Sequence, residues 1–264
     1  MTRLRALLSK ELLDVRRNPV TLLPVLLVTF LAFLIPFLVI VVIPAVTGLR
    51  IGDEPDLVRL SAVVGAAEGM SRDGRVQLFL FQQFLLLFLL TPITGAMALA
   101  AHSIVGEKQA RTLEPLLATP ITTSELLVAK VLGAAIPTAA ISAIGFALYV
   151  TAMVLTAEPG VVRAMLSART LVLVAVVGPM AALVSLQAAI VVSSRVNDAR
   201  TAQQFSVLII VPLMGVLVAQ FSGSLWLSAS TLALIGLGLT GVWILLVLLS
   251  VVIFDREAIL TRWK

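Results

Sequence analysis

The chain has 264 residues, of which 60% are hydrophobic and 12% are charged. A soluble domain carries about 25% charged residues, so this composition excludes an ordinary soluble protein. The net charge of +5 could suit a nucleic-acid-binding protein, but basic loops that orient membrane helices explain it more simply, and we expect no nucleic acid partner. The sequence contains no cysteine, which excludes disulfides and thiol chemistry.

The first 19 residues predict an amphipathic helix. Basic residues lie mostly on one side of this helix, and the residue before Pro19 is expected to end it because proline disfavours helical geometry at that position. Basic amphipathic helices lie in the plane of the lipid headgroups. We therefore predict an interfacial helix over residues 1–19, with a merely solvated basic leader as the alternative. Its apolar face consists of Leu4, Leu7, Leu8, Leu12 and Val15.

Six continuous apolar runs follow this helix. A helix of roughly 20 apolar residues crosses a hydrocarbon core of about 30 Å. The runs do not alternate with a period of two, which argues against barrel strands. We therefore predict an all-α polytopic membrane protein with a single transmembrane domain over residues 1–264. The six predicted spans are residues 20–46, 78–101, 131–156, 171–192, 205–221 and 231–254.

The positions of Lys and Arg predict how these spans are oriented. If the N-terminus lies inside, the inner segments hold 13 of these residues and the outer segments hold 6. Lys and Arg accumulate in cytoplasmic loops. Because six spans return the chain to its starting side, we expect both termini in the cytoplasm, together with the segment between the second and third runs.

The second apolar run carries a polar stripe. A polar side chain that faces lipid forfeits hydrogen bonds, so this stripe is expected to face protein or a water-filled path. Two interpretations stay open: close packing through small, weakly polar residues, or a translocation path lined by Gln83, Thr91 and Thr94. The stripe consists of Gln83, Thr91, Thr94, Gly95, Ala98 and His102.

The spans hold little that could catalyse a reaction. His102 is the single histidine of the sequence, and no acidic residue lies inside a predicted span. Intramembrane carboxylates usually mark proton or ion relays. We therefore expect a non-catalytic protein with no metal site and no cofactor of its own.

The segment between the second and third runs contains two signals for helix starts. Thr112 can cap a short helix, and Thr122 with Glu125 forms a capping box for the next one. Glu107 and Arg111 have the spacing of an ion pair on one helix face. Such a short helix across the membrane surface suits docking to a cytoplasmic partner, whereas a plain loop needs no caps. The helix would display Leu113, Leu116 and Leu117.

The sequence of this segment, GEKQARTLEPLLATPITTSELLVAK at residues 106–130, resembles the corresponding segment of type-two ATP-binding-cassette (ABC) exporter permeases. Arg111 stands where that family usually has glycine. The stretches NDARTAQQFSVLIIVP and FDREAILTRWK resemble the second cytoplasmic loop and the short basic tail of the same family. The resemblance covers the whole chain. It implies the type V exporter fold and an exporter of the kind that moves sodium, drugs or peptides.

The resemblance implies that residues 106–125 form a coupling helix that inserts into a separate cytoplasmic ABC ATPase subunit. The sequence has no Gly-Lys dipeptide and so lacks a phosphate-binding loop; ATP and Mg are expected on that partner. A second permease subunit is also implied, in a homodimer or a heterodimer within the lipid of the plasma membrane. The residues expected to contact the ATPase are Glu107, Lys108, Arg111, Thr112, Leu113, Glu114, Leu116 and Leu117.

Two functions are compatible with these patterns. The first is a permease subunit of an ATP-driven exporter that moves an ion, drug, peptide or lipid-like molecule out of the cytoplasm. The alternative is a membrane module that transmits ATPase motion, or anchors a complex, without moving a solute itself. The polar stripe of the second run favours the first.

Overall fold

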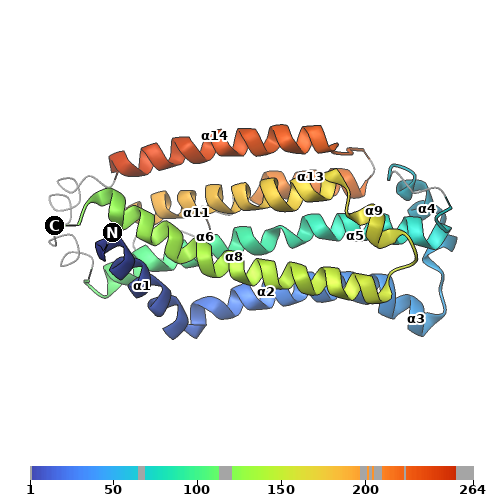
Figure 1. Ribbon diagram of the computed structural model, residues 1–264, viewed down its shortest axis with the longest axis horizontal. Helices are drawn as coiled ribbons and strands as arrows, with labels where there is room; N and C mark the ends of the chain where they lie inside the picture. The colour runs from blue at the N-terminus through green and yellow to red at the C-terminus, as the bar shows by residue number, and fades with distance from the viewer. Residues whose placement is uncertain are drawn as a thin grey trace.

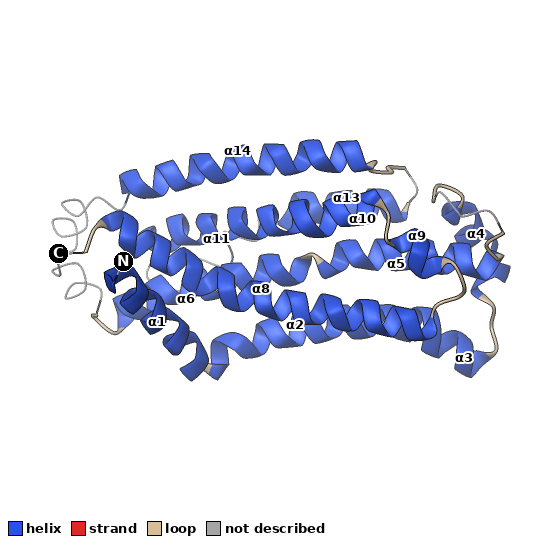
Figure 2. Ribbon diagram, in the orientation of Figure 1, coloured by secondary structure: helices blue, strands red, loops and turns tan. Residues whose placement is uncertain are grey.

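The computed structural model describes residues 2–64, 69–112, 121–196, 201, 204, 210–222 and 224–253. These residues form helices joined by short connections, with no strand among them. The long helices run side by side along the long axis of the molecule (Figures 1 and 2). The predicted all-α class is therefore confirmed. Within the described residues, five helices are long and apolar enough to cross a membrane.

The described elements follow one another in the order of the chain. Two of them, η1 and η3, are π-helical, and η2 is a short 3-10 turn. The elements are α1 (Thr2–Arg17), α2 (Pro19–Phe37), η1 (Leu38–Val42), α3 (Ile43–Thr47), η2 (Ile51–Asp53), α4 (Pro55–Ser61), α5 (Arg72–Phe88), α6 (Leu90–Gln109), α8 (Thr123–Thr156), α9 (Val161–Met165), α10 (Ala168–Val172), η3 (Leu173–Val177), α11 (Gly178–Arg195), α13 (Ile210–Phe221) and α14 (Ala229–Ile253).

The N-terminal helix ends where the sequence predicts. Helix α1 stops at Arg17, and Pro19 begins α2, where its missing N–H leaves no intrahelical hydrogen bond unmade. Figure 1 shows α1 turning away from the direction of α2. The apolar face of α1 packs on α8, with Leu7 buried. Its position in the headgroup plane stays a prediction.

The second predicted span is broken in its middle. Helix α5 ends at Phe88 and α6 begins at Leu90. Pro92 explains the break, because its ring clashes with the carbonyl of the residue four positions earlier and it cannot donate a hydrogen bond to that carbonyl. The two helices together extend from Arg72 to Gln109, well beyond the predicted run at both ends.

Two buried clusters hold the helices together. The first contains an aromatic group in which Tyr149 contacts Phe37, Phe81 and Phe88, and the Tyr149 hydroxyl donates to the carbonyl of Phe81 over 2.9 Å. The second lies nearer to α1 and joins α6, α8 and α11. Helix α11 packs between α6 and α14. The second cluster is centred on Ile93, Met97, Leu99, Leu127, Leu186 and Ile190.

The fifth predicted span falls partly outside the described residues. Helix α13 covers 12 residues, Ile210–Phe221, and the first five residues of the predicted run, 205–209, are not described. The count of six spans and the single-domain organisation therefore stay predictions.

Candidate functional site

Helix α1, the end of α6 and the start of α8 meet at one end of the molecule (Figure 1). Gly133 allows the close contact between α1 and α8. A Cβ atom at this position would lie 2.6 Å from the Cβ of Glu11, closer than two carbon atoms can approach. The absence of a side chain at Gly133 therefore brings the Glu11 carboxylate to α8, one turn from Lys130.

Lys130 is the centre of a buried ion-pair cluster. Its side chain is 0% exposed, and its Nζ lies 2.7 Å from Glu107 Oε2 and 3.3 Å from Glu11 Oε1. The ammonium also donates to the carbonyl of Ser103 over 3.1 Å. A single lysine of α8 thus links α8 to both α1 and α6.

Lys10 closes the cluster from the solvent side. Its ammonium donates to Glu107 and to Glu11, and it lies 3.4 Å from Asp14 Oδ2. Burial on its own would lower the pKa of Lys10, but the hydrogen bond and charge of Glu107, followed by those of Glu11, outweigh burial and raise this pKa. Two lysines thus balance the two buried glutamates, so little net charge is withdrawn from water.

Lys108 binds the end of a further helix. Its Nζ donates to the carbonyls of Ser193, Ser194 and Val196 at 2.8, 2.9 and 3.0 Å. These carbonyls lie at the C-terminal end of α11, where the last turn has no intrahelical donors and carries partial negative charge. Neighbouring residues of α6 therefore attach this helix to α1 and α8 on one side and to α11 on the other.

Helix α6 ends in a Schellman motif. Arg111 has a φ of 55°, the Thr112 N–H donates to the carbonyl of Glu107, and the Arg111 N–H donates to the carbonyl of Lys108. The predicted pair between Glu107 and Arg111 is wrong: the described part of the chain pairs Glu107 with Lys10 and Lys130. The physical reason is that the left-handed backbone takes Arg111 out of the helix.

Arg111→Gly is expected to raise the free energy of unfolding by about 1 kcal/mol. A left-handed conformation costs a residue with a Cβ about 1–2 kcal/mol, whereas glycine adopts it freely. Thermal unfolding in detergent would measure the change, with Arg5→Gly in the exposed face of α1 as the control that should be destabilising. A lower stability for Arg111→Gly would contradict the assignment of the motif.

The next helix starts with the predicted capping box, which is confirmed. The Glu125 N–H donates to Thr122 Oγ1 over 3.2 Å, and the Thr122 N–H donates to Glu125 Oε2 over 2.9 Å. The segment of residues 113–120 thus leaves from a Schellman motif and ends just before a capping box. Both flanks have defined helix ends.

The predicted ATPase-contact residues divide into three groups. Glu107 and Lys108 engage groups of their own chain, whereas Arg111 and Thr112 are exposed at the same end. The other four lie outside the described residues. The contact with an ATPase stays a prediction for all eight. The four outside the described ranges are Leu113, Glu114, Leu116 and Leu117.

The predicted path residues lie within the helical bundle. Gln83 and Thr91 are 0% exposed, and Thr94 is partly buried, with its hydroxyl donating to the carbonyl of Leu90. On the same stripe, a Cβ at Gly95 would lie 2.9 Å from Val25 Cγ1, so this face packs closely on α2. These positions favour the packing interpretation. The path itself stays a prediction.

Thr91→Val is expected to leave stability unchanged or to raise it by up to about 1 kcal/mol. The Thr91 hydroxyl is buried and has no hydrogen-bond partner among the described residues. Replacing it with a methyl group removes the desolvation penalty of an unpaired hydroxyl. Transport at unchanged expression would be measured beside stability. Altered transport with unchanged stability would instead support a path along this face.

A second polar cluster, at the opposite end, was not anticipated from the sequence. Arg169 is 8% exposed. Its guanidinium lies 4.1 Å from the ring centroid of Trp226. The sequence had indicated only that Arg169 belongs to an outer loop. The Arg169 guanidinium donates to the carbonyl of Leu227 and to the side-chain oxygens of Gln82 and Gln220, at 2.9, 2.9 and 3.0 Å. No periodic pattern in the sequence connects Arg169 with these partners.

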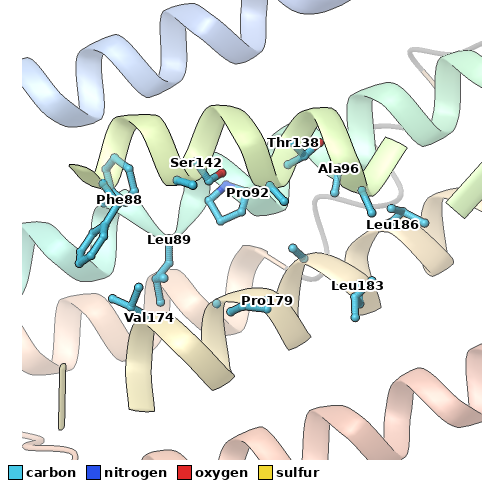
Figure 3. Close-up of a pocket in the computed structure, with 16 residues that line it drawn as sticks. Phe88, Leu89, Pro92, Ala96, Thr138, Ser142, Val174, Pro179, Leu183 and Leu186 are labelled. Carbon is cyan, nitrogen blue, oxygen red and sulfur yellow. The ribbon is translucent and has the colours of Figure 1, made fainter. Parts of the chain in front are cut away.

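A cavity lies between α6, α8 and α11, as Figure 3 shows. Its volume is about 440 Å³. The break in the second span contributes Phe88, Leu89 and Pro92, while Gln83, Thr91 and Thr94 are absent from its lining. The described structure therefore separates this hollow from the residues predicted to line a path.

The helices, their apolar surfaces and the buried ion pairs at one end define a polytopic helical membrane protein. The family model of the ABC-2 family transporter proteins matches residues 5–249. The chain therefore belongs to this family and is an ABC-2 type permease, the membrane transport component of an ABC transporter that works with an ABC ATPase subunit. No curated protein matches the chain.

Proposed function

We propose that this permease is the membrane subunit of an ATP-driven exporter, and that movement of a separate ATPase reaches it through residues 106–125. The observation that carries the proposal is the buried ion-pair cluster at the base of this segment. Glu107 is the second residue of the segment and Lys130 lies five residues after its end, and their side chains are 2.7 Å apart. The two flanks of the segment are therefore joined to one group of contacting helices.

The contacts of this cluster suggest how motion would spread. Lys130 joins α8 to Glu11 of α1 and to Glu107 of α6, and Lys108 joins α6 to the end of α11. A push on the segment would move these four helices together, because breaking the cluster would leave buried charges without partners. The apolar side chains of Leu113, Leu116 and Leu117 are the proposed contacts with the ATPase.

The remaining parts of the proposed transporter are separate subunits. ATP and Mg would bind the ATPase, and a second permease subunit, identical or different, would complete the membrane part. The 13-to-6 distribution of Lys and Arg supports cytoplasmic termini in a plasma membrane. With this orientation, the ion-pair cluster would lie on the same side of the membrane as the ATPase.

Reconstitution tests the proposal. The tagged permease would be co-expressed with candidate ABC ATPases, and the purified complex would be placed in liposomes. We expect the permease to retain an ATPase, and ATP to drive movement of a sodium, lipophilic-dye or peptide probe in one direction. A complex that hydrolyses ATP and moves none of these would favour the module without a solute, and a permease that retains no ATPase would refute the proposal.

The proposed orientation has its own expected result. In a chain without native cysteine, Ala62→Cys should react with a membrane-impermeant maleimide in intact cells, whereas Ser9→Cys and Thr261→Cys should not. Ser9 lies in α1 and Ala62 directly follows α4, and both residues are exposed. Figure 1 shows these two helices at opposite ends of the molecule. Permeabilised cells give the control in which Ser9→Cys must react. Labelling of Ser9→Cys in intact cells would overturn the orientation.

A further inference from the structure

The cavity between α6, α8 and α11 has the size of a small-molecule site. Its volume of about 440 Å³ lies within the range of about 300–1,000 Å³ that such sites span. Figure 3 shows Ser142 and Thr138 of α8 on one wall, Pro179 and Leu183 of α11 on the other, and Leu89 at the break of the second span. All of these walls belong to helices that are apolar enough to cross a membrane.

The hollow exists because the facing walls carry small side chains. Small residues at this spacing normally let two membrane helices touch. Here Gly178 receives Leu89 instead, since a Cβ at this glycine would lie 2.8 Å from Leu89 Cδ2. Helix α11 therefore packs against Leu89 at the break of the second span, and the space between α11 and α8 stays open. The small residues are Ala135, Ala139 and Ala143 on α8, and Gly178 and Ala182 on α11.

The lining suits an apolar occupant rather than water. A buried water needs two to four polar partners. The lining includes two hydroxyl groups, and that of Thr138 already donates to the carbonyl of Ala134 over 2.8 Å. Left empty, a space of this size would deprive its lining of dispersion contacts. An apolar molecule supplies those contacts without needing several hydrogen bonds.

Ser142 adds one polar requirement. The hydroxyls of Thr138, Thr151 and Thr156 on the same helix donate to the carbonyl four residues earlier. The Ser142 hydroxyl lines the cavity, is buried, and has no hydrogen-bond partner among the described residues. A buried hydroxyl without a partner is costly. A ligand with one hydrogen-bonding group would remove this cost.

We propose that the cavity binds a lipophilic small molecule from the membrane, with an apolar body and a single hydroxyl or carbonyl group that pairs with Ser142. The proposal concerns binding, and it holds whether or not the bound molecule is transported. It therefore goes beyond the proposed exporter function and can fail independently of it.

The test uses two photoreactive probes with the permease in lipid nanodiscs. One probe is a medium-chain fatty alcohol with a diazirine in the chain and an alkyne at the far end; the other has a methyl group in place of the hydroxyl. Mass spectrometry locates the adducts. We expect the alcohol to label residues 135–146 and 174–186 severalfold more than the exposed leucines of α14, and unlabelled fatty alcohol should displace it saturably.

Variants separate the site from bulk lipid. Ala139→Phe and Ala182→Phe fill the cavity and should reduce the labelling severalfold, whereas Ala140→Phe, exposed on α8 and outside the lining, should not. Ser142→Ala should weaken labelling by the alcohol and leave the methyl probe unchanged. If the cavity-filling variants fold poorly, displacement of the probe by unlabelled fatty alcohol, measured on the unaltered chain, still tests whether the cavity is a saturable site. The proposal would be overturned if the alcohol probe labelled α14 as strongly as the cavity, or if unlabelled fatty alcohol did not displace it. It would also be overturned if the cavity were not labelled because another subunit covers it.

Discussion

Lys130→Ala is expected to lower the free energy of unfolding by about 3–5 kcal/mol. The substitution leaves the carboxylates of Glu11 and Glu107 buried beside one remaining lysine, because Lys130 is fully buried between them at 3.3 and 2.7 Å. It also removes the donor to the carbonyl of Ser103. Thermal unfolding in detergent, followed by size-exclusion chromatography, would measure the loss.

A charge-matched control isolates the cluster. Arg163→Ala removes one positive charge from an exposed position and should change stability by less than about 0.5 kcal/mol. Lys130→Met combined with Glu107→Gln should be more stable than Lys130→Ala, because it removes one charge of each sign. If Lys130→Ala were as stable as Arg163→Ala, the buried ion pairs would have no role in holding α1, α6 and α8 together.

The double substitution Leu116→Asp with Leu117→Asp is expected to abolish coupling between the ATPase and transport. A carboxylate forced into an apolar interface must be desolvated without a partner. A cost of about 3 kcal/mol already weakens binding by about a hundredfold. The retained amount of ATPase after co-purification and the ATP-driven flux in liposomes would both be measured.

The control for this variant places a single carboxylate on α1, away from the substituted leucines in the sequence. Ser9→Asp lies on the exposed face of α1 and should leave ATPase binding and flux intact. Both variants should keep the thermal stability of the unaltered chain, because none of the substituted residues belongs to the buried ion-pair cluster of Lys10, Glu11, Glu107 and Lys130. Normal binding and flux in the double variant would refute the role of this segment in coupling.

The sequence predicted the local structure well wherever short-range chemistry decides it. The end of α1 before Pro19 and the capping box of Thr122 and Glu125 depend on residues within one turn of each other. The apolar face of α1 follows from helical spacing in the same way. Long-range neighbours have no part in these features, so one sequence is sufficient to find them.

The interaction partners of the charged residues could not be found in this way. Glu107 and Arg111 have the spacing of a helical pair, yet Glu107 pairs with Lys10, 97 residues away in the chain. Glu11 interrupts the apolar face of α1, and that interruption was the one available signal that this face meets a charge. Arg169 gave no such signal, because Gln82, Gln220 and Trp226 come from separate parts of the chain.

The sequence by itself determined that this protein is a helical membrane protein, because continuous apolar runs can satisfy their backbone hydrogen bonds in lipid only within each helix. The motif at residues 106–130 also indicated the family. The tertiary structure decided which polar groups meet and where space remains. Lys130 finds Glu11 because Gly133 admits α1, and the cavity beside Ser142 persists because Gly178 is filled by Leu89. Both outcomes depend on the separation between helices, which the pattern of a single helix does not contain.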